Sequence, residues 1–358
     1  MSVRTVGLIG LGGVARRIHL PAIAGLAGLR LVGAAEVDPE NERLAAARNR
    51  VPRVYRRVEE LLAAERPEIV IVGTPPSLHF EHVRASLEAG AHVLCEKPFV
   101  TTIDEADALI DLAEKSGRLL AVNNQYRFMT IYRETERRLR SGEFGEPYQI
   151  QVWQQMYHPP SFEKNWRAGL LRSTLYEFGT HALDLVCFLF GSIPEAVSAN
   201  IPRVPQGVES DVLVVLTLRF AGGKVATLNL HRLSHAPERY LEMRLDATEA
   251  SIRLSLGGVA RFSLDWVRSL GRPQMKASYV RGGEARVERR GRSRVLSRSP
   301  RPEFASATAS HLADFLRRLD EGRTGAEAAR HAREILRVVF AAYLSAESGK
   351  TVEIPPAS

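Results

Sequence analysis

Short apolar runs alternate with amphipathic segments through the first third of the chain, and this alternation limits the folds open to it. The runs have the length of strands, and the segments between them repeat apolar residues at helical spacing. Such alternation predicts a parallel sheet with crossover helices, an α/β fold. The expected strands are 6–9, 29–35, 69–72, 92–95 and 119–122, and the expected helices are 40–48, 77–89 and 103–116.

Residues that start and stop helices agree with this pattern. Thr102 with Glu105 three residues later has the form of a capping box. Asp38 before Pro39 indicates a helix start, and Gly90 and Gly117 stand where helix C-caps are expected.

The pattern changes after about residue 123. A basic helix at 129–140 leads into a strand at 149–156, and three further runs predict an antiparallel meander whose first turn is Ala221-Gly222-Gly223. The runs are 212–220, 224–232 and 239–245, and later helices are expected at 174–189, 307–320 and 326–345. We therefore predict two domains: a doubly wound parallel α/β domain over 1–123, and an α+β domain on a mainly antiparallel sheet over 124–358.

The positive charge of the chain is concentrated in one segment. The 358 residues carry a net charge of +8, and residues 276–303 contribute +6 of it through nine Lys or Arg against three Asp or Glu. Such a patch can bind nucleic acid, but neither interleaved aromatic residues nor a nucleic-acid motif accompanies it. We expect a solvated, Arg-rich hairpin or loop, and nucleic acid is not an expected partner. Recruitment of an anionic substrate is a milder alternative.

Composition excludes several other classes of protein. Hydrophobic residues make up 45% and charged residues 25% of the chain, which excludes disorder over most of it. No run of eighteen apolar residues exists, so no membrane span is expected. The N-terminus shows no secretory signal. Cys95 and Cys187 are too few for a disulfide framework, so we expect a cytoplasmic protein.

A glycine-rich turn follows the first expected strand. Residues 10–15, Gly-Leu-Gly-Gly-Val-Ala, have the pattern G-x-G-x-x-A at the start of a helix. The first glycine permits a tight turn, the second lets the backbone approach a pyrophosphate, and the helix N-terminus offers N–H groups to the phosphates. The predicted cofactor-binding residues of this turn are Gly10, Gly12, Gly13 and Val14.

An acidic residue, Glu36, ends the second expected strand, 26 positions after Gly10. A carboxylate there accepts hydrogen bonds from the adenosine ribose and repels a 2′-phosphate. No Arg follows it immediately, so we expect NAD as the cofactor, with NADP as the alternative. The competing interpretation of Glu36 is a solvated strand end.

Three more segments complete a family pattern. They are Thr-Pro-Pro-Ser-Leu-His at 74–79, Cys-Glu-Lys-Pro at 95–98 and Glu-Phe-Gly-Thr-His-Ala-Leu-Asp at 177–184. In this order and spacing the chain resembles the glucose–fructose oxidoreductase, inositol dehydrogenase and MocA (Gfo/Idh/MocA) family. The likeness includes 141–147 and 341–349 and covers nearly the whole length. It implies an N-terminal Rossmann domain and a C-terminal α/β domain whose open sheet often forms the dimer face.

The resemblance also implies a catalytic lysine. Lys97 would end a Rossmann strand and point at the reacting carbon, with a cis peptide before Pro98. A partly desolvated lysine has a pKa lowered towards neutrality, which suits proton transfer. Without the resemblance, Lys97 is a surface lysine after a strand.

A helix near residue 180 carries the other expected acid–base group. Glu177, His181 and Asp184 lie on one helical stripe. His181 is the natural general acid or base, and Glu177 would orient its ring or pair with Lys97. The family usually has Asp at the position of Glu177, after a Gly-rich run that is Arg172-Ser173-Thr174 here, and this departure leaves the substrate open. The alternatives are a buried structural histidine and a metal site, which the family's chemistry does not need; Asp184 is expected to be structural.

Further residues are expected to surround the cofactor or the substrate. A helix start is the alternative role for His79, and core packing is the alternative for Trp166. The remaining cofactor-binding candidates are Thr74, Pro75, His79, Glu96 and Asn124, and the substrate-binding candidates are Arg127, Tyr157, His158, Trp166 and Arg167.

These inferences predict an NAD(P)-dependent dehydrogenase or reductase that acts on a CH–OH group of a sugar, cyclitol or related polyol. Lys97 and His181 would exchange the hydroxyl proton. The resemblance implies a homodimer or homotetramer formed through the C-terminal sheet. The alternative is a non-catalytic nucleotide-binding sensor or partner protein that kept the fold.

Overall fold

The chain divides into two compact units. The computed structural model describes residues 3–47, 51–163, 165–235, 239–257, 261–267, 272–278, 282–299 and 303–356. The first unit comprises Met1–Phe128 with Phe304–Phe340, and the second comprises Met129–Glu303 with Ala341–Pro356.

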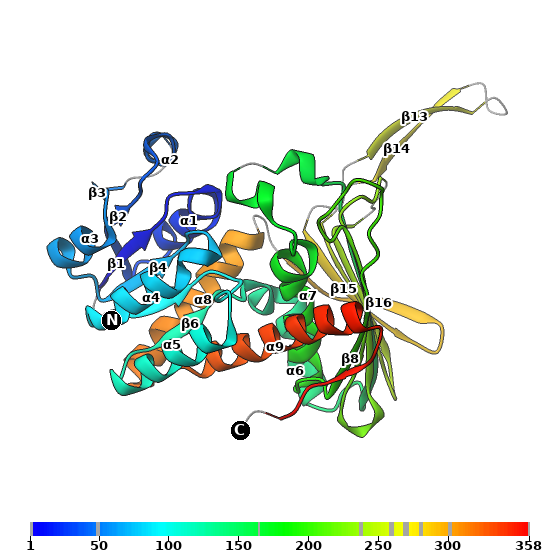
Figure 1. The fold of residues 1–358 in the computed structure, drawn as a ribbon. Helices are drawn as coiled ribbons and strands as arrows, with labels where there is room; N and C mark the ends of the chain where they lie inside the picture. Colours follow the sequence, from blue (N-terminus) through cyan, green and yellow to red (C-terminus); the bar gives the residue numbers. More distant parts are fainter. Residues whose placement is uncertain are drawn as a thin grey trace. The chain divides into compact units, whose positions relative to one another are not determined.

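A six-stranded parallel sheet is the centre of the first unit (Figure 1). Its strand order is β3-β2-β1-β4-β5-β6, so the direction of winding reverses between β1 and β4, where ligands bind in doubly wound folds. The central strand β4 is buried along its whole length, as expected where helices cover both faces. The strands are β1 (Arg4–Ile9), β2 (Leu29–Ala35), β3 (Val54–Tyr55), β4 (Ile69–Val72), β5 (His92–Cys95) and β6 (Leu120–Val122). The five predicted strands are confirmed, and β3 is additional.

The helices of this unit begin where the sequence indicates. The Asp38 carboxylate accepts a hydrogen bond from the backbone N of Glu40 at 2.9 Å, and Thr102 and Glu105 form the expected capping box. The helices are α1 (Leu20–Ala24), α2 (Pro39–Ala46), α3 (Val58–Glu65), α4 (His79–Glu88), α5 (Ile103–Lys115), α8 (Glu303–Asp320) and α9 (Glu327–Ser348), and the end of α9 from Ala341 on belongs to the second unit. The sequence patterns miss α3.

The late helix α8 belongs to the first unit. Its residues Leu312, Phe315 and Leu319 share a hydrophobic core with Val6 and Leu8 of β1. Residues 304–340 therefore lie with the Rossmann sheet, which corrects the expected second domain over 124–358. The reason is the apolar stripe of α8, which is buried on that sheet.

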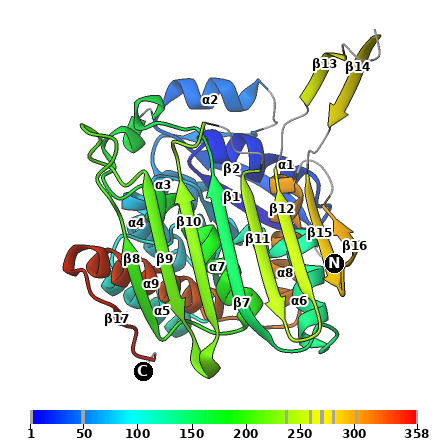
Figure 2. The same cartoon turned by 90° about the vertical axis from the view of Figure 1, so that its right-hand side faces the viewer.

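A nine-stranded sheet forms the second unit (Figure 2). The order is β16-β15-β12-β11-β7-β10-β9-β8-β17, and every pairing is antiparallel except that of β7 with β10. The strands are β7 (Pro147–Gln155), β8 (Ala196–Asn200), β9 (Leu213–Arg219), β10 (Val225–His231), β11 (Leu241–Ala247), β12 (Ser251–Leu256), β15 (Gly283–Arg289), β16 (Arg292–Arg298) and β17 (Val352–Glu353). Strands β13 (Arg261–Val267) and β14 (Arg272–Ser278) pair separately.

The expected meander is only partly right. Strands β9 and β10 pair across the turn at Ala221–Gly223 as predicted, but β11 pairs with β7 and not with β10. An alternating sequence specifies which face of a strand is buried, but it does not specify the neighbour.

Helices α6 (Thr130–Arg140) and α7 (Thr180–Phe190) lie on one side of this sheet. On β7, Ile150, Val152 and Gln154 are buried on the inner side, while Trp153 between them is exposed. The segment Thr174–Gly179 before α7 is π-helical, so the expected continuous helix over 174–189 has two geometries. None of the described helices is long and apolar enough to cross a membrane.

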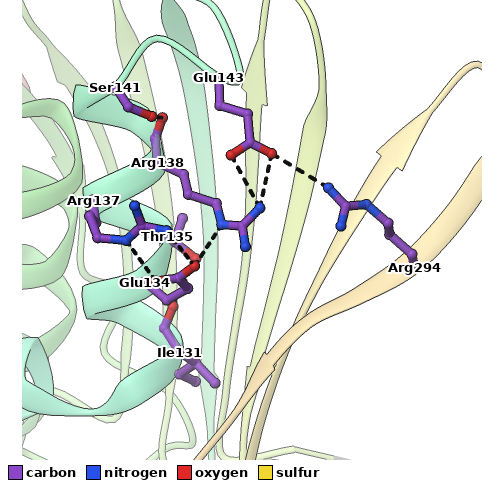
Figure 3. A network of polar contacts seen from close by, with 8 residues as sticks. All are labelled: Ile131, Glu134, Thr135, Arg137, Arg138, Ser141, Glu143 and Arg294. Carbon is purple, nitrogen blue, oxygen red and sulfur yellow. Dashed lines mark hydrogen bonds and ion pairs between the residues drawn. The ribbon is translucent and has the colours of Figure 1, made fainter.

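Residues 283–298 of the Arg-rich segment form a hairpin, whereas residues 276–278 end β14. Arg290 (φ 47°) and Gly291 (φ 76°) join β15 to β16 in a turn with two left-handed residues. Glu143 binds Arg138 at 3.0 Å and Arg294 at 3.4 Å (Figure 3). Because β16 is an edge strand, its exposed arginines oppose pairing with another chain. A hairpin is thus confirmed for 283–298, but only its turn and much of β16 are exposed, because Gly283, Ala285 and Val287 of β15 are buried. Residues 279–281 and 300–302 lie outside the described residues.

Candidate active site

The glycine-rich turn has the geometry that a dinucleotide needs. Gly10 has a φ of +89°, and a Cβ there would lie 3.0 Å from the carbonyl oxygen of Gly73, so this position requires glycine. A Cβ on Gly12 would meet no atom within 4 Å, so the space above this backbone is open. Val14 precedes the helical segment Ala15–His19, whose N-terminus offers N–H groups to an anion. The turn therefore fits a pyrophosphate.

Glu36 lies beside this turn, at the end of β2. Oε2 of Glu36 accepts a hydrogen bond from the backbone N of Leu11 at 2.7 Å, and Oε1 accepts one from the backbone N of Asp38 at 2.9 Å. A carboxylate has about four lone-pair sites, so these bonds leave capacity for ribose hydroxyls. Glu36 is also buried, so the structure does not show it as a solvated strand end.

The residues after β4 are tied to those after β5 through His79. Its Nε2 lies 2.8 Å from the carbonyl oxygen of Thr74, and its Nδ1 lies 3.0 Å from those of Pro98 and Phe99. Burial lowers the pKa of His79, against the opposing effect of these oxygens. His79 begins α4, while Pro75 precedes the short helical turn Pro76–Leu78. His79 thus fixes the loop that includes Thr74.

Lys97 follows β5, and its peptide is held by Glu96. The backbone N of Lys97 donates to Oε2 of Glu96 at 3.1 Å, and Oε1 of the same carboxylate receives His19 Nε2 and Asn123 Nδ2, both at 2.7 Å. Burial alone would raise the pKa of Glu96, but His19, Asn123 and the nearby Lys97 charge lower it to about 2. The carboxylate is therefore ionised at neutral pH. The expected cis peptide between Lys97 and Pro98 is present.

Asn123 continues this network to α8. Its Oδ1 lies 3.1 Å from His311 Nδ1, and its Nδ2 lies 3.4 Å from Thr308 Oγ1. Burial lowers the pKa of His311 to about 4, so the neutral ring donates through Nδ1. The Phe128 ring stacks on His311, with ring centroids 4.3 Å apart. Nearby, Asn124 donates its backbone N to Val122, and Arg127 hydrogen-bonds His331.

In the second unit, Arg167 connects a loop to the start of the expected catalytic helix. Its Nε donates to Glu177 Oε1 at 2.6 Å, and its guanidinium lies over the Trp166 ring, 4.3 Å from the centroid. Glu177, His181 and Asp184 are all buried. Gly179 permits close packing of this segment on the sheet, because a Cβ there would lie 2.6 Å from Leu230 of β10.

Asp211 caps the π-helical segment, and no sequence motif marks this residue. Its Oδ1 accepts backbone N–H groups from Ser173 at 2.5 Å and Thr174 at 2.8 Å. Its Oδ2 accepts from Leu175 N at 3.0 Å and from the Tyr343 hydroxyl at 2.7 Å. Burial raises the pKa of Asp211 above its ordinary value, although these four donors oppose the shift. The Asp211 carboxylate thus fixes the helix start three residues before Glu177.

Arg232 and Glu163 form a second buried ion pair beside the loop that carries Arg167. Arg232 is fully buried, binds Glu163 and donates to Ser173 Oγ at 2.5 Å. His158 Nε2 lies 3.2 Å from Glu163 Oε1. Tyr157, which follows the end of β7, is half exposed. Within the residues whose coordinates are described, no group of three His, Cys, Asp or Glu side chains is placed to hold a metal ion.

The predicted site residues thus form two groups. Those of the first unit follow the carboxyl ends of β1, β2, β4, β5 and β6, which lie at one edge of the sheet. Those of the second unit lie on the loop before the π-helical segment, within that segment at Glu177, and on the following helix at His181. His19, which lies in the helical segment after the glycine-rich turn, joins the first group through its hydrogen bond to Glu96. Asp211, Glu163, Arg232 and His311 are additional, and no sequence motif marks them.

Two family models match the chain. The model described as "Oxidoreductase family, NAD-binding Rossmann fold" matches residues 4–124. The model described as "GFO/IDH/MocA C-terminal domain" matches residues 132–253.

Among similar proteins, the scyllo-inositol 2-dehydrogenase (NADP+) of Bacillus subtilis is 26% identical over 84% of this chain and 82% of its own. The D-apiose dehydrogenase of Paraburkholderia graminis is 25% identical over 97% of this chain and 88% of its own. An Agrobacterium radiobacter oxidoreductase, solved in complex with NAD+, L-tartaric acid and magnesium, has the same fold. Its TM-score is 0.80 at 20% identity, over 98% of both chains. The chain therefore belongs to the Gfo/Idh/MocA oxidoreductase family and binds its nicotinamide dinucleotide through the N-terminal Rossmann fold.

Proposed function

We propose that this oxidoreductase transfers a hydride between the nicotinamide cofactor and a CH–OH carbon of a sugar, cyclitol or related polyol. Lys97 and His181 act as the acid–base groups of this reaction. The observation that carries the proposal is the hydrogen-bonding of the Lys97 peptide to the buried, ionised Glu96 at the carboxyl end of β5. Named relatives act on an inositol and on apiose.

The residues at the sheet edge fit the cofactor. Gly10, Gly12 and the helix N-terminus would hold the pyrophosphate, and Glu36 would hold the ribose. When bound, the nicotinamide supplies the hydride acceptor or donor. Glu36 carries a buried negative charge beside the turn, which repels a 2′-phosphate and favours NAD over NADP.

On this proposal, oxidation proceeds with removal of the hydroxyl proton by either Lys97 or His181, while the other stabilises the charge that develops on oxygen. Reduction reverses these roles. Glu177 is held by Arg167 at 2.6 Å, so its charge is already partnered, and its function is to position neighbouring groups.

We further propose a homodimer or homotetramer formed through the nine-stranded sheet. Trp153 of β7 and Val215 of β9 are each 40% exposed, and both are in register with Asn229 of β10. Their side chains belong to the strand positions that alternate with the buried ones, so they share the face opposite α6 and α7. Cys95 and Cys187 are buried free thiols, which fits the cytoplasm as the site of action.

The test is NAD-linked turnover on a panel of inositols, aldoses and alditols. We expect NADH to form with at least one of them, and the substitution Lys97→Ala to slow this turnover by about 10²–10⁴-fold. A protein that binds NAD tightly and oxidises or reduces none of these compounds would support the non-catalytic alternative.

A further inference from the structure

A cavity of about 740 Å³ lies within the second unit, beside the loop that carries Arg167. Residues of 157–171 form one wall, residues of 205–210 form another, and Arg232, Leu233 and His235 complete it. No part of the proposed reaction above uses this space.

The cavity is joined to the predicted reaction centre by named hydrogen bonds. Arg167 lines it and donates through Nε to Glu177 at 2.6 Å. The backbone N of Asp211 donates to the Leu171 carbonyl at 3.0 Å, which joins the two walls at the residue that caps the helix of Glu177. Arg167 therefore places the cavity one side chain away from Glu177.

The cavity is too large for one sugar ring. Water takes about 30 Å³ per heavy atom in the liquid, and covalently bonded atoms are more closely spaced. A hexose of about twelve heavy atoms therefore fills less than about 360 Å³ on this scale, which is half of the 740 Å³ present. The volume lies in the ~300–1,000 Å³ range of sites that bury ligands of several rings.

The wall of the cavity offers an aromatic platform. Tyr157 is 47% exposed, and its ring lies on that of His235 with centroids 4.6 Å apart and planes inclined by 32°. Phe162 packs edge-on against Tyr157 at 6.1 Å. His235 and Phe162 thus contact the Tyr157 ring, while part of this ring faces solvent. A fixed aromatic ring with a polar tip suits the C–H face of a pyranose, whose rim carries hydroxyl groups.

The charges of the cavity exclude an anionic ligand. Its two arginines are already paired, Arg232 with Glu163 and Arg167 with Glu177, and Glu209 adds a further carboxylate. The lining therefore offers no excess positive charge to a phosphate or carboxylate. The milder alternative of an anionic substrate finds no support at this site.

We propose that this cavity binds a second, uncharged sugar ring, so that the substrate is a glycoside or disaccharide. The inference rests on the proposed function, because it assigns the substrate class of that same site. Tyr157 is the residue that determines this specificity, by stacking on the second ring.

The experiment compares D-glucose and D-galactose with maltose, cellobiose and lactose, using full-length enzyme and NAD. We expect kcat/KM for at least one disaccharide to exceed that of its monosaccharide by about tenfold. Tyr157→Ala should reduce the ratio of the two kcat/KM values about tenfold through KM, whereas Tyr157→Phe, which keeps the ring, should hold it within about twofold. The proposal is overturned if the ratio of disaccharide to monosaccharide kcat/KM is near one in the wild type. It is also overturned if Tyr157→Ala leaves a high ratio unchanged.

A failure of the proposed function can be distinguished from a failure of the proposed sugar site. If none of the five sugars is oxidised, the proposed reaction fails for them, and saturation-transfer NMR with the same disaccharides decides about the cavity. Saturation transfer to both rings in the wild type that falls in Tyr157→Ala supports a two-ring site, and its absence in the wild type overturns it.

Discussion

The backbone N of Lys97 lies 3.1 Å from Oε2 of Glu96 and donates a hydrogen bond to this neighbouring side chain. The other oxygen of the same carboxylate is fixed by His19 and Asn123. Three segments of the chain therefore converge on one buried charge, and this charge holds the peptide that carries the predicted catalytic amine.

The first prediction concerns the pH dependence of stability. The folded-state pKa of Glu96 is about 2, against an ordinary value of 4.5. Ionised Glu96 therefore stabilises the fold above about pH 4.5, and this contribution is lost as the pH falls through 2. A shift of this size corresponds to about 3 kcal/mol.

Glu96→Gln should thus lower the free energy of unfolding by about 2–4 kcal/mol at pH 7. The difference from the wild type should narrow as the pH drops below about 4.5. Urea unfolding at several pH values measures it, with the exposed Glu88→Gln as the control. A difference that stays constant from pH 7 to pH 3 would contradict this role of Glu96.

The second prediction concerns the cap formed by Asp211. Asp211→Asn presents an amide donor to groups that themselves donate, namely Leu175 N and the Tyr343 hydroxyl. We expect a loss of about 2–4 kcal/mol of unfolding free energy, because these two buried donors lose their acceptor. Tyr343→Phe removes one of the four hydrogen bonds and should cost about 1 kcal/mol. Equal stability of Asp211→Asn and the wild type in urea would show that the cap is unimportant.

The third prediction concerns the choice between NAD and NADP. Glu36→Ser removes the carboxylate that repels a 2′-phosphate, and Arg56, which binds the Glu36 carbonyl at 3.0 Å, remains nearby. The ratio of the NAD and NADP dissociation constants should move towards NADP by at least about tenfold, or about 1.4 kcal/mol. Isothermal titration with both cofactors measures this ratio, and Glu42→Gln, which removes the carboxylate that pairs with Arg56, is the control. An unchanged ratio would remove Glu36 as the determinant.

The fourth prediction concerns assembly. Trp153→Glu places a charge in the open face of the sheet and should shift the assembled protein to a smaller particle, because burying an unpaired carboxylate opposes association. Light scattering after size exclusion gives the mass. Val204→Glu changes a similarly exposed apolar residue in a loop outside the strands and should leave the mass unchanged. A wild type that is monomeric throughout would refute the proposed interface.

Much of the first unit could be predicted from sequence because its signals are local. The strands at 29–35, 69–72 and 92–95 have the predicted bounds. The Thr102–Glu105 box depends on residues three apart, and the turn at Gly10 depends on a conformation that favours glycine.

The polar networks could not be predicted because their partners are distant in sequence. His311 meets Asn123 across 188 positions, and Tyr343 meets Asp211 across 132. No spacing rule connects such pairs. His311 meets Asn123 only because α8 packs on the Rossmann sheet. The position of β7 between β10 and β11 was hidden for the same reason, since strand pairing is a tertiary property.

The last measurement is single-turnover NADH formation by Lys97→Ala with the best substrate of the panel, beside NAD affinity measured by titration. Lys115→Ala, an exposed lysine of α5 whose ion pair with Asp111 spans 3.7 Å, is the matched control. If Lys97 is an acid–base group, the rate falls about 10²–10⁴-fold, NAD affinity stays within about threefold, and Lys115→Ala behaves as the wild type. A Lys97→Ala enzyme that forms NADH at the wild-type rate would contradict the proposed chemistry.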